Sequence, residues 1–434
     1  MSALAPPLAR AVSGQTGIVR SLEESLPVPA EPPHFQATCT VAGGEGVLGT
    51  PLGHVTGIGG AGMTWTEAAN AAVGEALERY SASFVPPHRL VAATAQELGA
   101  AAVEPGRFAL FSRRQHDAAG FPFRPFVAGE PVNWVRGWSV ADGRPAWLPA
   151  ELAFLGDATL AGLPPIGYAT SSGLACADTA DEALVRAACE LLERDAFVLA
   201  WSNRLSLPRL DWSHDERLVE LEQRLFAVTG LAYSVVDLSC FHRLPSFLAV
   251  VRAPEHCRGA LGLGAGTAAS VSRAWWKALA EAFATRSAAA KFELAGPERS
   301  YGPAGAGVVT FDDHIRYYTD HRRARAADFL DASSDVTLSG AVPGLEGSDQ
   351  LAALGRRVRA AGSDLYAVDV TSPDVRELGL VVIRAIAPEL CALDVPRSAR
   401  FLGGRRLYHA AAQLGLRERP LAEDDVNPEP HPFP

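Results

Sequence analysis

The sequence predicts a mixed α+β (α/β) fold, in which helices carrying a repeated acidic motif pack on β-sheets. Two short apolar runs, at 247–253 (FLAVVRA) and 378–387 (LGLVVIRAIA), have the composition of buried strands. Three Ala-rich stretches, at 65–84, 180–200 and 272–291, are long enough for helices and place apolar residues at helical spacing. Strands and helices that alternate along one chain indicate this mixed class.

Length and composition exclude several classes of protein. The chain has 434 residues, 48% hydrophobic and 20% charged, which fits two or three globular domains or one large domain. The formal net charge of -10 argues against a nucleic acid or an anionic membrane surface as the main partner. No apolar run approaches about 18 residues, and the N-terminus lacks a secretory signal pattern, so we expect a cytoplasmic protein.

Three segments differ in pattern. Residues 1–47 are rich in proline and show no sustained period, so an irregular N-terminal segment is expected there. Residues 48–420 contain the strands and helices and form the main domain. Residues 421–434 finish on NPEPHPFP and form a tail.

The motif GEALERY at 74–80 returns as CELLERD at 189–195, and each copy belongs to the longer pattern EA-x6-ExxER. A looser third copy lies at 274–286. The first helix has a capping box at its start, in the stretch TWTE at 64–67, and Thr179 or Asp181 could cap the second. The repetition predicts two equivalent helices that arose by duplication.

The paired carboxylates of these helices require a partner of opposite charge. At about 100° per residue, Glu75 and Glu78 lie on the same side of their helix, and Glu190 and Glu193 repeat the arrangement. Like charges at this spacing repel, and more strongly when they are buried, so an inward-facing pair needs a cation such as Mg²⁺. Two interpretations remain open: a solvated helix face neutralised by arginines, or a nest of carboxylates that joins metal to phosphate.

A glycine-rich match to GxGxxG at 57–62 precedes the first helix. A dinucleotide fold needs a second strand after that helix, ending in an acid that binds the ribose, whereas the acids here lie within the helix itself. The match therefore does not indicate dinucleotide binding.

The C-terminal tail alternates proline with other residues up to Pro434. Alternating proline favours an extended polyproline II conformation and lowers the entropy cost of holding a tail in a groove. The tail is either a disordered stub or a stiff segment that delivers its terminal carboxylate to an active site as a general base.

Together these features resemble the YcaO family of ATP-dependent enzymes that activate peptide amide bonds, and more closely its azoline-forming cyclodehydratase branch in ribosomal peptide biosynthesis. The resemblance covers about residues 48–434, and implies that 48–420 is the ATP-binding catalytic domain and that the tail reaches the active site. It rests on the proline tail and on GGAGMTWTEAANAAVGEALERYSA, SSGLACADTADEALVRAACELLERDAF, KALAEAFATR, VDVTSPDV and FLGGRRLY.

The resemblance assigns roles residue by residue. The magnesium-binding glutamates of the family fall on Glu75, Glu78, Glu190, Glu193 and Glu281. Positions that contact nucleotide fall on Asp178 and Glu182, and basic positions that read phosphate fall on Arg194 and Lys277, with Arg286 a weaker candidate. In relatives with this tail the terminal carboxylate assists proton removal, which implies a catalytic role for Pro434.

Three positions depart from the family pattern. Ala61 stands where the family often has the lysine of GKG, and Ala71 where it often has serine, and both losses would weaken nucleotide binding. Asp178 replaces a common asparagine and adds negative charge near phosphate.

The implied reaction begins when a Cys, Ser or Thr side chain of a precursor peptide attacks the preceding carbonyl carbon. ATP then phosphorylates the resulting oxygen, and loss of phosphate gives a thiazoline or oxazoline. The chain has no CxxC zinc pairs and no N-terminal partner module, so a leader-binding (E1-like or similar) partner protein in trans is expected. A flavin dehydrogenase in the same pathway and a homodimer are compatible with the resemblance.

Two alternatives stay open. One is a non-catalytic YcaO-like scaffold that binds peptide or partner, which Ala61 and Ala71 would favour. The other is a member that uses external sulfide to make a thioamide, against which the proline tail argues.

Overall fold

The computed structural model describes residues 4–26, 31–42, 58–296, 300–345 and 349–433. The chain divides into two compact units. Unit 1 comprises Met1–Pro27, His34–Leu191 and Leu351–Glu389, and unit 2 comprises Val28–Pro33, Leu192–Gln350 and Leu390–Pro434. The predicted mixture of helices and sheets is confirmed. In the described residues no helix is both long and apolar enough to cross a membrane.

The three predicted long helices are confirmed, with each end within four residues of its predicted position. They are α3 (Trp65–Ser83), α7 (Ala180–Ser202) and α9 (Val271–Ala295). Thr64 caps α3, since its hydroxyl accepts the N–H of Glu67, and Thr179 caps α7 in the same way through Glu182. The Glu67 carboxylate accepts the N–H of Met63 at 2.8 Å, so only half of the predicted capping box forms.

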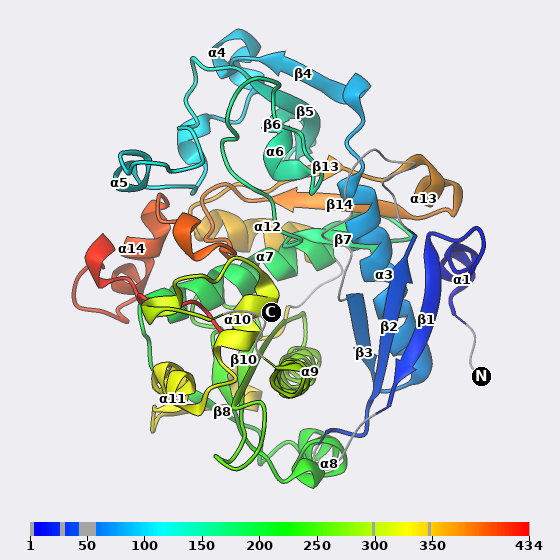
Figure 1. The fold of residues 1–434 in the computed structure, drawn as a ribbon, viewed down its shortest axis with the longest axis vertical. Helices are drawn as coiled ribbons and strands as arrows, with labels where there is room; N and C mark the ends of the chain where they lie inside the picture. Colours follow the sequence, from blue (N-terminus) through cyan, green and yellow to red (C-terminus); the bar gives the residue numbers. More distant parts are fainter. Residues whose placement is uncertain (1–3, 27–30, 43–57, 297–299, 346–348, 434) are drawn as a thin grey trace. The chain divides into compact units, whose positions relative to one another are not determined.

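The first sheet of unit 1 is a three-stranded antiparallel sheet that packs on α3 (Figure 1). Its strands are β1 (Val19–Ser25), β2 (Phe35–Val41) and β3 (Ile58–Gly62), and α1 (Pro6–Ala11) precedes them. The expectation of an irregular segment over 1–47 is therefore wrong for α1, β1 and β2. These strands bury small residues such as Ala37 against α3 and leave alternate positions exposed, so they lack the long apolar run that marks a central strand.

The second sheet of unit 1 has the strand order β4-β5-β13-β14-β7, with β6 paired to β5. Its strands are β4 (Leu90–Ala93), β5 (Val132–Ser139), β6 (Pro145–Pro149), β7 (Leu174–Ala177), β13 (Tyr366–Asp369) and β14 (Val381–Ile386). The short helices of this unit are α4 (Ala95–Leu98), α5 (Arg113–His116), α6 (Ala150–Ala153) and α13 (Pro373–Glu377). Helix α12 (Gln350–Ala360) also belongs to unit 1, apart from its first residue, Gln350, which is assigned to unit 2.

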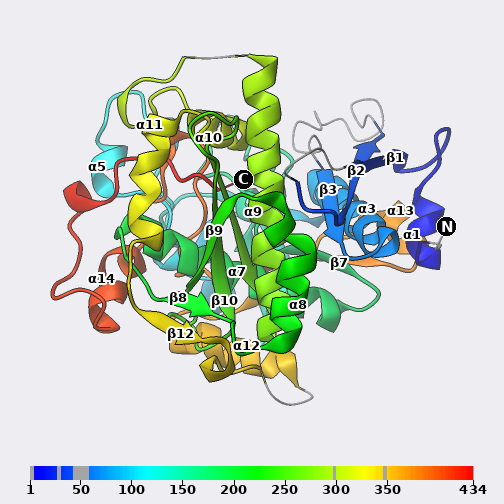
Figure 2. The same ribbon diagram turned by 90° about the horizontal axis from the view of Figure 1, so that it is seen from below.

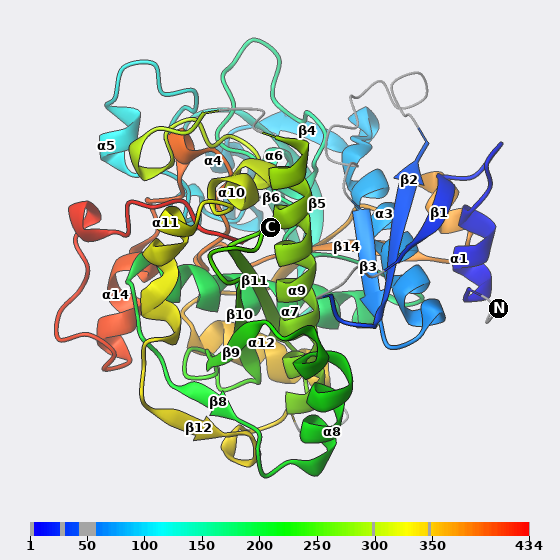
Figure 3. The ribbon, with the colours of Figure 1, turned by 60° about the horizontal axis from the view of Figure 1, so that its bottom comes forward.

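Unit 2 has a five-stranded sheet of order β11-β10-β9-β8-β12, in which only the β8–β12 pair is parallel. Its strands are β8 (Arg209–Asp211), β9 (Ala232–Asp237), β10 (Ser246–Arg252), β11 (Leu261–Thr267) and β12 (Val336–Leu338). Helix α9 runs along β10 and β11 (Figure 3), and α8 (Glu216–Leu225) lies beside α9 (Figure 2). The remaining helices are α10 (Phe311–Tyr317), α11 (His321–Ala324) and α14 (Arg405–Gln413).

Glycine strands let α3 and α9 approach their sheets closely. A Cβ atom on Gly60 of β3 would lie 2.3 Å from the carbonyl oxygen of Ala68, and one on Gly266 of β11 would lie 2.0 Å from that of Ala274. Such distances are far below van der Waals contact, so helix and strand backbones touch directly. The same glycine-to-helix spacing in both places makes β3–α3 and β11–α9 two copies of one strand–helix element.

Replacing the glycine at this contact should destabilise the protein. We expect Gly60→Ala to lower the free energy of unfolding by about 1–3 kcal/mol, because the added methyl group overlaps the α3 backbone. The matched control is Gly74→Ala within α3, where a Cβ meets nothing within 4 Å; it should leave stability unchanged or raise it by about 1 kcal/mol. Urea unfolding followed by circular dichroism measures both, and equal effects of the two changes would contradict the close contact.

Candidate functional site

Each glutamate assigned to magnesium accepts a hydrogen bond from a main-chain N–H group at the outer edge of a sheet. In the described residues β3, β7 and β11 are edge strands, and the donors lie in these strands, except for Gly173, which directly precedes β7. The pairs are Glu75 with Gly59 (3.2 Å), Glu78 with Cys176 (2.8 Å), Glu190 with Gly173 (3.1 Å), Glu193 with Thr267, and Glu281 with Ala265 (2.7 Å). One oxygen of each carboxylate is thereby fixed, and the side chains do not form a freely solvated helix face.

In unit 1 the structure brings Glu75, Glu78 and Glu190 into electrostatic contact. Burial raises the pKa of Glu78 to about 8, and the negative charges of Glu190 and Glu75 add to this, while the Cys176 N–H and Arg79 oppose it. Arg79 pairs with Glu75 at 2.5 Å. A buried acid with a raised pKa lacks a compensating positive charge, which a bound cation would supply.

Arg384 of β14 is a buried cation near this cluster that the sequence did not single out. Its guanidinium donates to the carbonyl oxygens of Ala153 (3.0 Å) and Ser172 (2.5 Å). Burial lowers its pKa to about 10, and the negative charge of Glu190 opposes that shift. Arg384 therefore fixes the turn before β7, from which Gly173 holds Glu190.

In unit 2 Glu193 and Glu281 lie with two basic side chains. Lys277 Nζ is 3.5 Å from Glu193 Oε2. Arg194 Nη1 is 3.7 Å from Glu193 Oε1, and Arg194 Nη2 is 3.9 Å from Glu281 Oε1. Burial raises the pKa of Glu281 to about 7; Arg194 and Lys277 lower it, and Glu193 raises it. This cluster thus combines carboxylates with the cations that the sequence assigned to phosphate.

The third, looser copy of the motif is the structural counterpart of the first. Glu75 accepts an N–H from 16 residues earlier in β3, and Glu281 accepts one from 16 residues earlier in β11. Glu281 is thus the equivalent of Glu75, and Lys277 stands where α3 has Ala71. In sequence α7 is more similar to α3, because the acidic motif ExxER recurs in α7, whereas the equivalence of α9 to α3 lies in the glycine strand that precedes each helix.

Three assigned residues lie apart from the two carboxylate clusters. Arg286 is buried against Gly262 and donates to the carbonyl of Arg258 at 2.8 Å, so it supports α9. Asp178 and Glu182 are exposed at the start of α7, where Glu182 pairs with Arg186. Pro434 lies outside the described residues.

Asp195, which follows Arg194 directly, is held by a buried network. Arg406 of α14 binds both of its carboxylate oxygens, the N–H of Cys391 donates at 2.8 Å, and His242 Nε2 lies 2.9 Å away. Burial alone would raise the pKa of Asp195, but Arg406 and His242 hold it well below its usual range. The network fixes the part of α7 that carries Glu193 and Arg194. The aspartate after ExxER and the arginine pair in FLGGRRLY were the signals in the sequence, but their pairing was not predictable.

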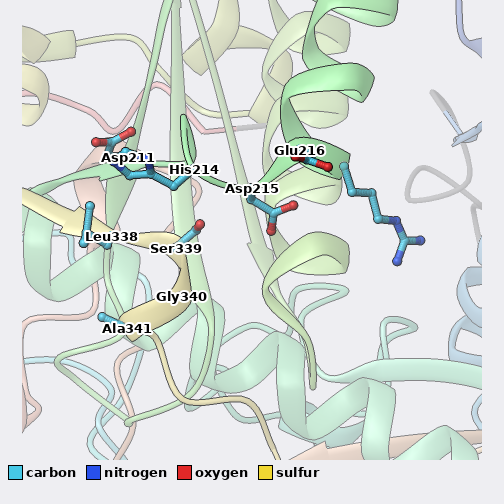
Figure 4. A pocket seen from close by; sticks show the side chains of 9 residues that line it. Asp211, His214, Asp215, Glu216, Leu338, Ser339, Gly340 and Ala341 are labelled. Carbon is cyan, nitrogen blue, oxygen red and sulfur yellow. The ribbon is translucent and has the colours of Figure 1, made fainter.

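A surface hollow of unit 2 contains none of the assigned residues (Figure 4). It is lined by the end of β8, the start of α8, and the end of β12 with the turn that follows it: Asp211, His214, Asp215, Glu216, Arg217, Leu338, Ser339, Gly340 and Ala341. Asp215 already caps α8 through the N–H of Leu218, so its carboxylate has a structural role.

Comparison with known proteins gives a family and a fold. The family described as YcaO cyclodehydratase, ATP- and Mg²⁺-binding, matches residues 59–391. A heterocyclase in complex with substrate and cofactor has a TM-score of 0.78 at 24% identity, over 99% of this chain and 57% of that one. The heterocyclase TruD has a TM-score of 0.67 at 26% identity, over 83% of this chain and 50% of the TruD chain. A chain of the E. coli microcin synthetase McbBCD complex with pro-MccB17 bound has a TM-score of 0.63 at 14% identity, over 95% of this chain and 96% of that one.

The chain spans only about half the length of the two heterocyclases, 57% and 50%. At identities of 24% and 14% the first and third similarities establish the fold.

Removing the guanidinium that neutralises Asp195 should destabilise the protein strongly. We expect Arg406→Met to lower the free energy of unfolding by about 3–5 kcal/mol, because it leaves a buried carboxylate without its main cation. The neighbouring Arg405→Met is the control, since Arg405 is exposed, and it should change stability by less than about 0.5 kcal/mol. Urea unfolding compares them, and a small loss for Arg406→Met would contradict the role of the network.

Proposed function

The chain belongs to the YcaO family, which is an ATP- and Mg²⁺-binding family, and from this premise we propose that it is an ATP-dependent cyclodehydratase subunit acting in the cytoplasm. Its substrate is a ribosomally made precursor peptide, in which Cys, Ser or Thr is converted to thiazoline or oxazoline. The observation that carries the proposal is the set of glutamates whose carboxylates are oriented by edge-strand N–H groups.

These carboxylates fit the chemistry of Mg²⁺. The ion prefers oxygen ligands, and each glutamate has a second oxygen beside the one that its main-chain N–H group fixes; in Glu75 this second oxygen accepts from Arg79. The raised pKa values of Glu78 and Glu281 have burial as their largest cause, and a divalent cation would offset the repulsion among the acids. In this proposal the magnesium ligands are Glu75, Glu78, Glu190, Glu193 and Glu281.

Arg194 and Lys277 suit the phosphate groups of ATP. They lie next to Glu193, so positive charge and metal ligands occur in one cluster. Asp178 and Glu182 at the exposed start of α7 are proposed to contact the remainder of the nucleotide, while the buried position of Arg286 favours a structural role.

What Mg²⁺ and ATP supply when bound is a phosphoryl group for the amide oxygen, which is otherwise a poor leaving group. The protein itself orients the peptide and stabilises phosphoryl charge through Arg194 and Lys277. We further propose that 48–420 is the catalytic domain and that the tail, 421–434, presents the carboxylate of Pro434 as the base that removes a proton from the peptide.

A partner protein is part of the proposal. The E. coli microcin synthetase McbBCD, which shares this fold, is a complex with pro-MccB17 bound. We propose that a leader-binding protein acts in trans here and brings the precursor peptide.

Charge-neutral replacement of the acids tests the metal site. We expect Glu78→Gln combined with Glu193→Gln to weaken Mg²⁺-dependent binding of a non-hydrolysable ATP analogue by more than about 100-fold, because two oriented ligands are lost. Isothermal titration calorimetry measures the affinity with and without Mg²⁺. The control is the exposed Glu220→Gln, which makes the same chemical change outside the clusters and should bind like the wild type. A wild type that binds no nucleotide even with its partner would instead favour the scaffold.

The terminal carboxylate is tested by moving it. Adding one glycine after Pro434 should lower the turnover number of ring formation by roughly 100-fold or more, because a general base acts only within hydrogen-bond reach. Nucleotide affinity should not change. Mass spectrometry of a Cys-containing peptide measures loss of water, and an unchanged turnover number would rule out this base.

A further inference from the structure

The tail of unit 2 is bound through its carbonyl oxygens. Pro428, Pro430 and Pro432 have no N–H group, so the tail offers mainly acceptors, and the surrounding residues supply donors. The bonds run from Arg400 to the carbonyl of Asn427 (2.7 Å), Trp201 to Glu429 (3.3 Å), Tyr318 to Pro430 (2.5 Å) and His314 to His431 (2.7 Å). Over the residues described, the tail is therefore a packed element and not a disordered stub.

Side chains of the tail add further contacts. The Asn427 amide is fully buried and donates to the carbonyl of Trp201, and Tyr317 donates to the Glu429 carboxylate at 2.8 Å. Pro430 lies against Gly305, where a Cβ would come within 2.6 Å of the proline ring. A tail held at successive residues keeps its last described residue in a fixed place.

The histidines at the end of the tail serve this docking. His314, Asp394 and His431 come close enough together to suggest a metal site. However, both ring nitrogens of His314 face main-chain carbonyls, those of His431 and Val395, at 2.7 and 2.8 Å. In His431, Nε2 lies 2.7 Å from the carbonyl of Asp394, and Nδ1 accepts the N–H of Phe433. These ring nitrogens bind main-chain groups of the tail and of the residues around it, so their role is to hold the tail in place.

Phe433 is the point at which the tail meets α7. Its side chain is fully buried and its ring centroid lies 4.8 Å from that of Phe197. The guanidinium of Arg194 lies over the Phe433 ring, with its central carbon 4.2 Å from the centroid of that ring. Arg194 is the residue that stands 3.7 Å from Glu193 and 3.9 Å from Glu281.

We propose that Phe433 is a positioning residue for nucleotide binding: its ring holds the Arg194 guanidinium flat and directed toward the phosphate groups of ATP. This inference rests on the proposed function, in which Arg194 reads phosphate. Phe433 does not touch the reacting atoms. It acts through Arg194, so seating of the tail and affinity for the nucleotide are coupled.

The physical basis is the attraction between a cation and the face of an aromatic ring. The attraction is strongest where both groups are shielded from water, and only 13% of the Arg194 side chain is exposed. A planar guanidinium that stacks on an aromatic ring directs its N–H groups outward in its own plane, toward oxygen acceptors. An aliphatic side chain of similar size fills the space but offers no such attraction.

The test compares Phe433→Leu with the wild type in the full-length chain. Calorimetric titration with a non-hydrolysable ATP analogue and Mg²⁺, without peptide, should give roughly 5- to 30-fold weaker binding for Phe433→Leu. Phe433→Tyr keeps the aromatic face and should restore affinity to within about threefold of the wild type. The matched control ends the chain at Phe433, which removes Pro434 and moves the proposed base but keeps the ring, so nucleotide affinity should not change.

A second measurement needs no substitution. Because coupling is reciprocal, the nucleotide should slow hydrogen exchange of the tail amides, among them that of Asn427, which donates to the carbonyl of Ser202 at 2.9 Å. Equal affinities of the wild type and a folded Phe433→Leu protein, or tail exchange that the nucleotide does not change, would overturn the inference. Absence of nucleotide binding in the wild type would instead count against the proposed function, so the two failures are distinguishable.

Discussion

The structure depends on the way in which edge strands bind helix glutamates. An edge strand presents main-chain N–H groups that no neighbouring strand can accept, and an unsatisfied N–H group is costly when buried. Here edge strands β3, β7 and β11 give such groups to Glu75, Glu78 and Glu281. Each bond satisfies the strand and fixes a carboxylate, so the sheet edge and the acid cluster stabilise one another. The arrangement also requires the helix to lie close to the strand, which explains why β3 and β11 are rich in glycine.

The sequence predicted the helices, because the residue pattern within one segment determines them. Helices over 65–84, 180–200 and 272–291 appear as α3, α7 and α9 because alanine and leucine at helical spacing and capping residues act within one segment. It failed for β1 and β2, whose buried faces carry small residues and whose surroundings are rich in proline. The sequence also could not predict which main-chain groups and side chains bind the acids. Cys176 and Glu78, or Asp195 and Arg406, are distant in the chain and meet only after the fold forms. No residue pattern encodes such a pairing without knowledge of the topology.

The two copies of the strand–helix element differ in charge in a way that suits different tasks. The α3 copy carries two acids, Glu75 and Glu78, followed by one arginine, Arg79. Negative charge therefore dominates its cluster. The α9 copy keeps only Glu281 and has Ala284 at the position of the second acid. It also has Lys277 at the position of Ala71. Its cluster therefore holds positive charge beside the acids, which suits phosphate as much as metal.

This division bears on the meaning of Ala71, which as an isolated departure favoured a non-catalytic scaffold. Since the two copies are equivalent in geometry, Lys277 on α9 places a basic side chain at the position that Ala71 occupies on α3. A chain drifting away from catalysis would have no reason to keep Glu193 at 3% exposure, because a buried carboxylate costs stability unless cations offset it. In this chain Lys277 and Arg194 lie beside it, and Arg194 is itself seated on a ring supplied by the docked tail. The cost of burial, the cations and the tail are thus parts of one arrangement, and that arrangement is easier to explain by nucleotide chemistry than by passive binding of a peptide.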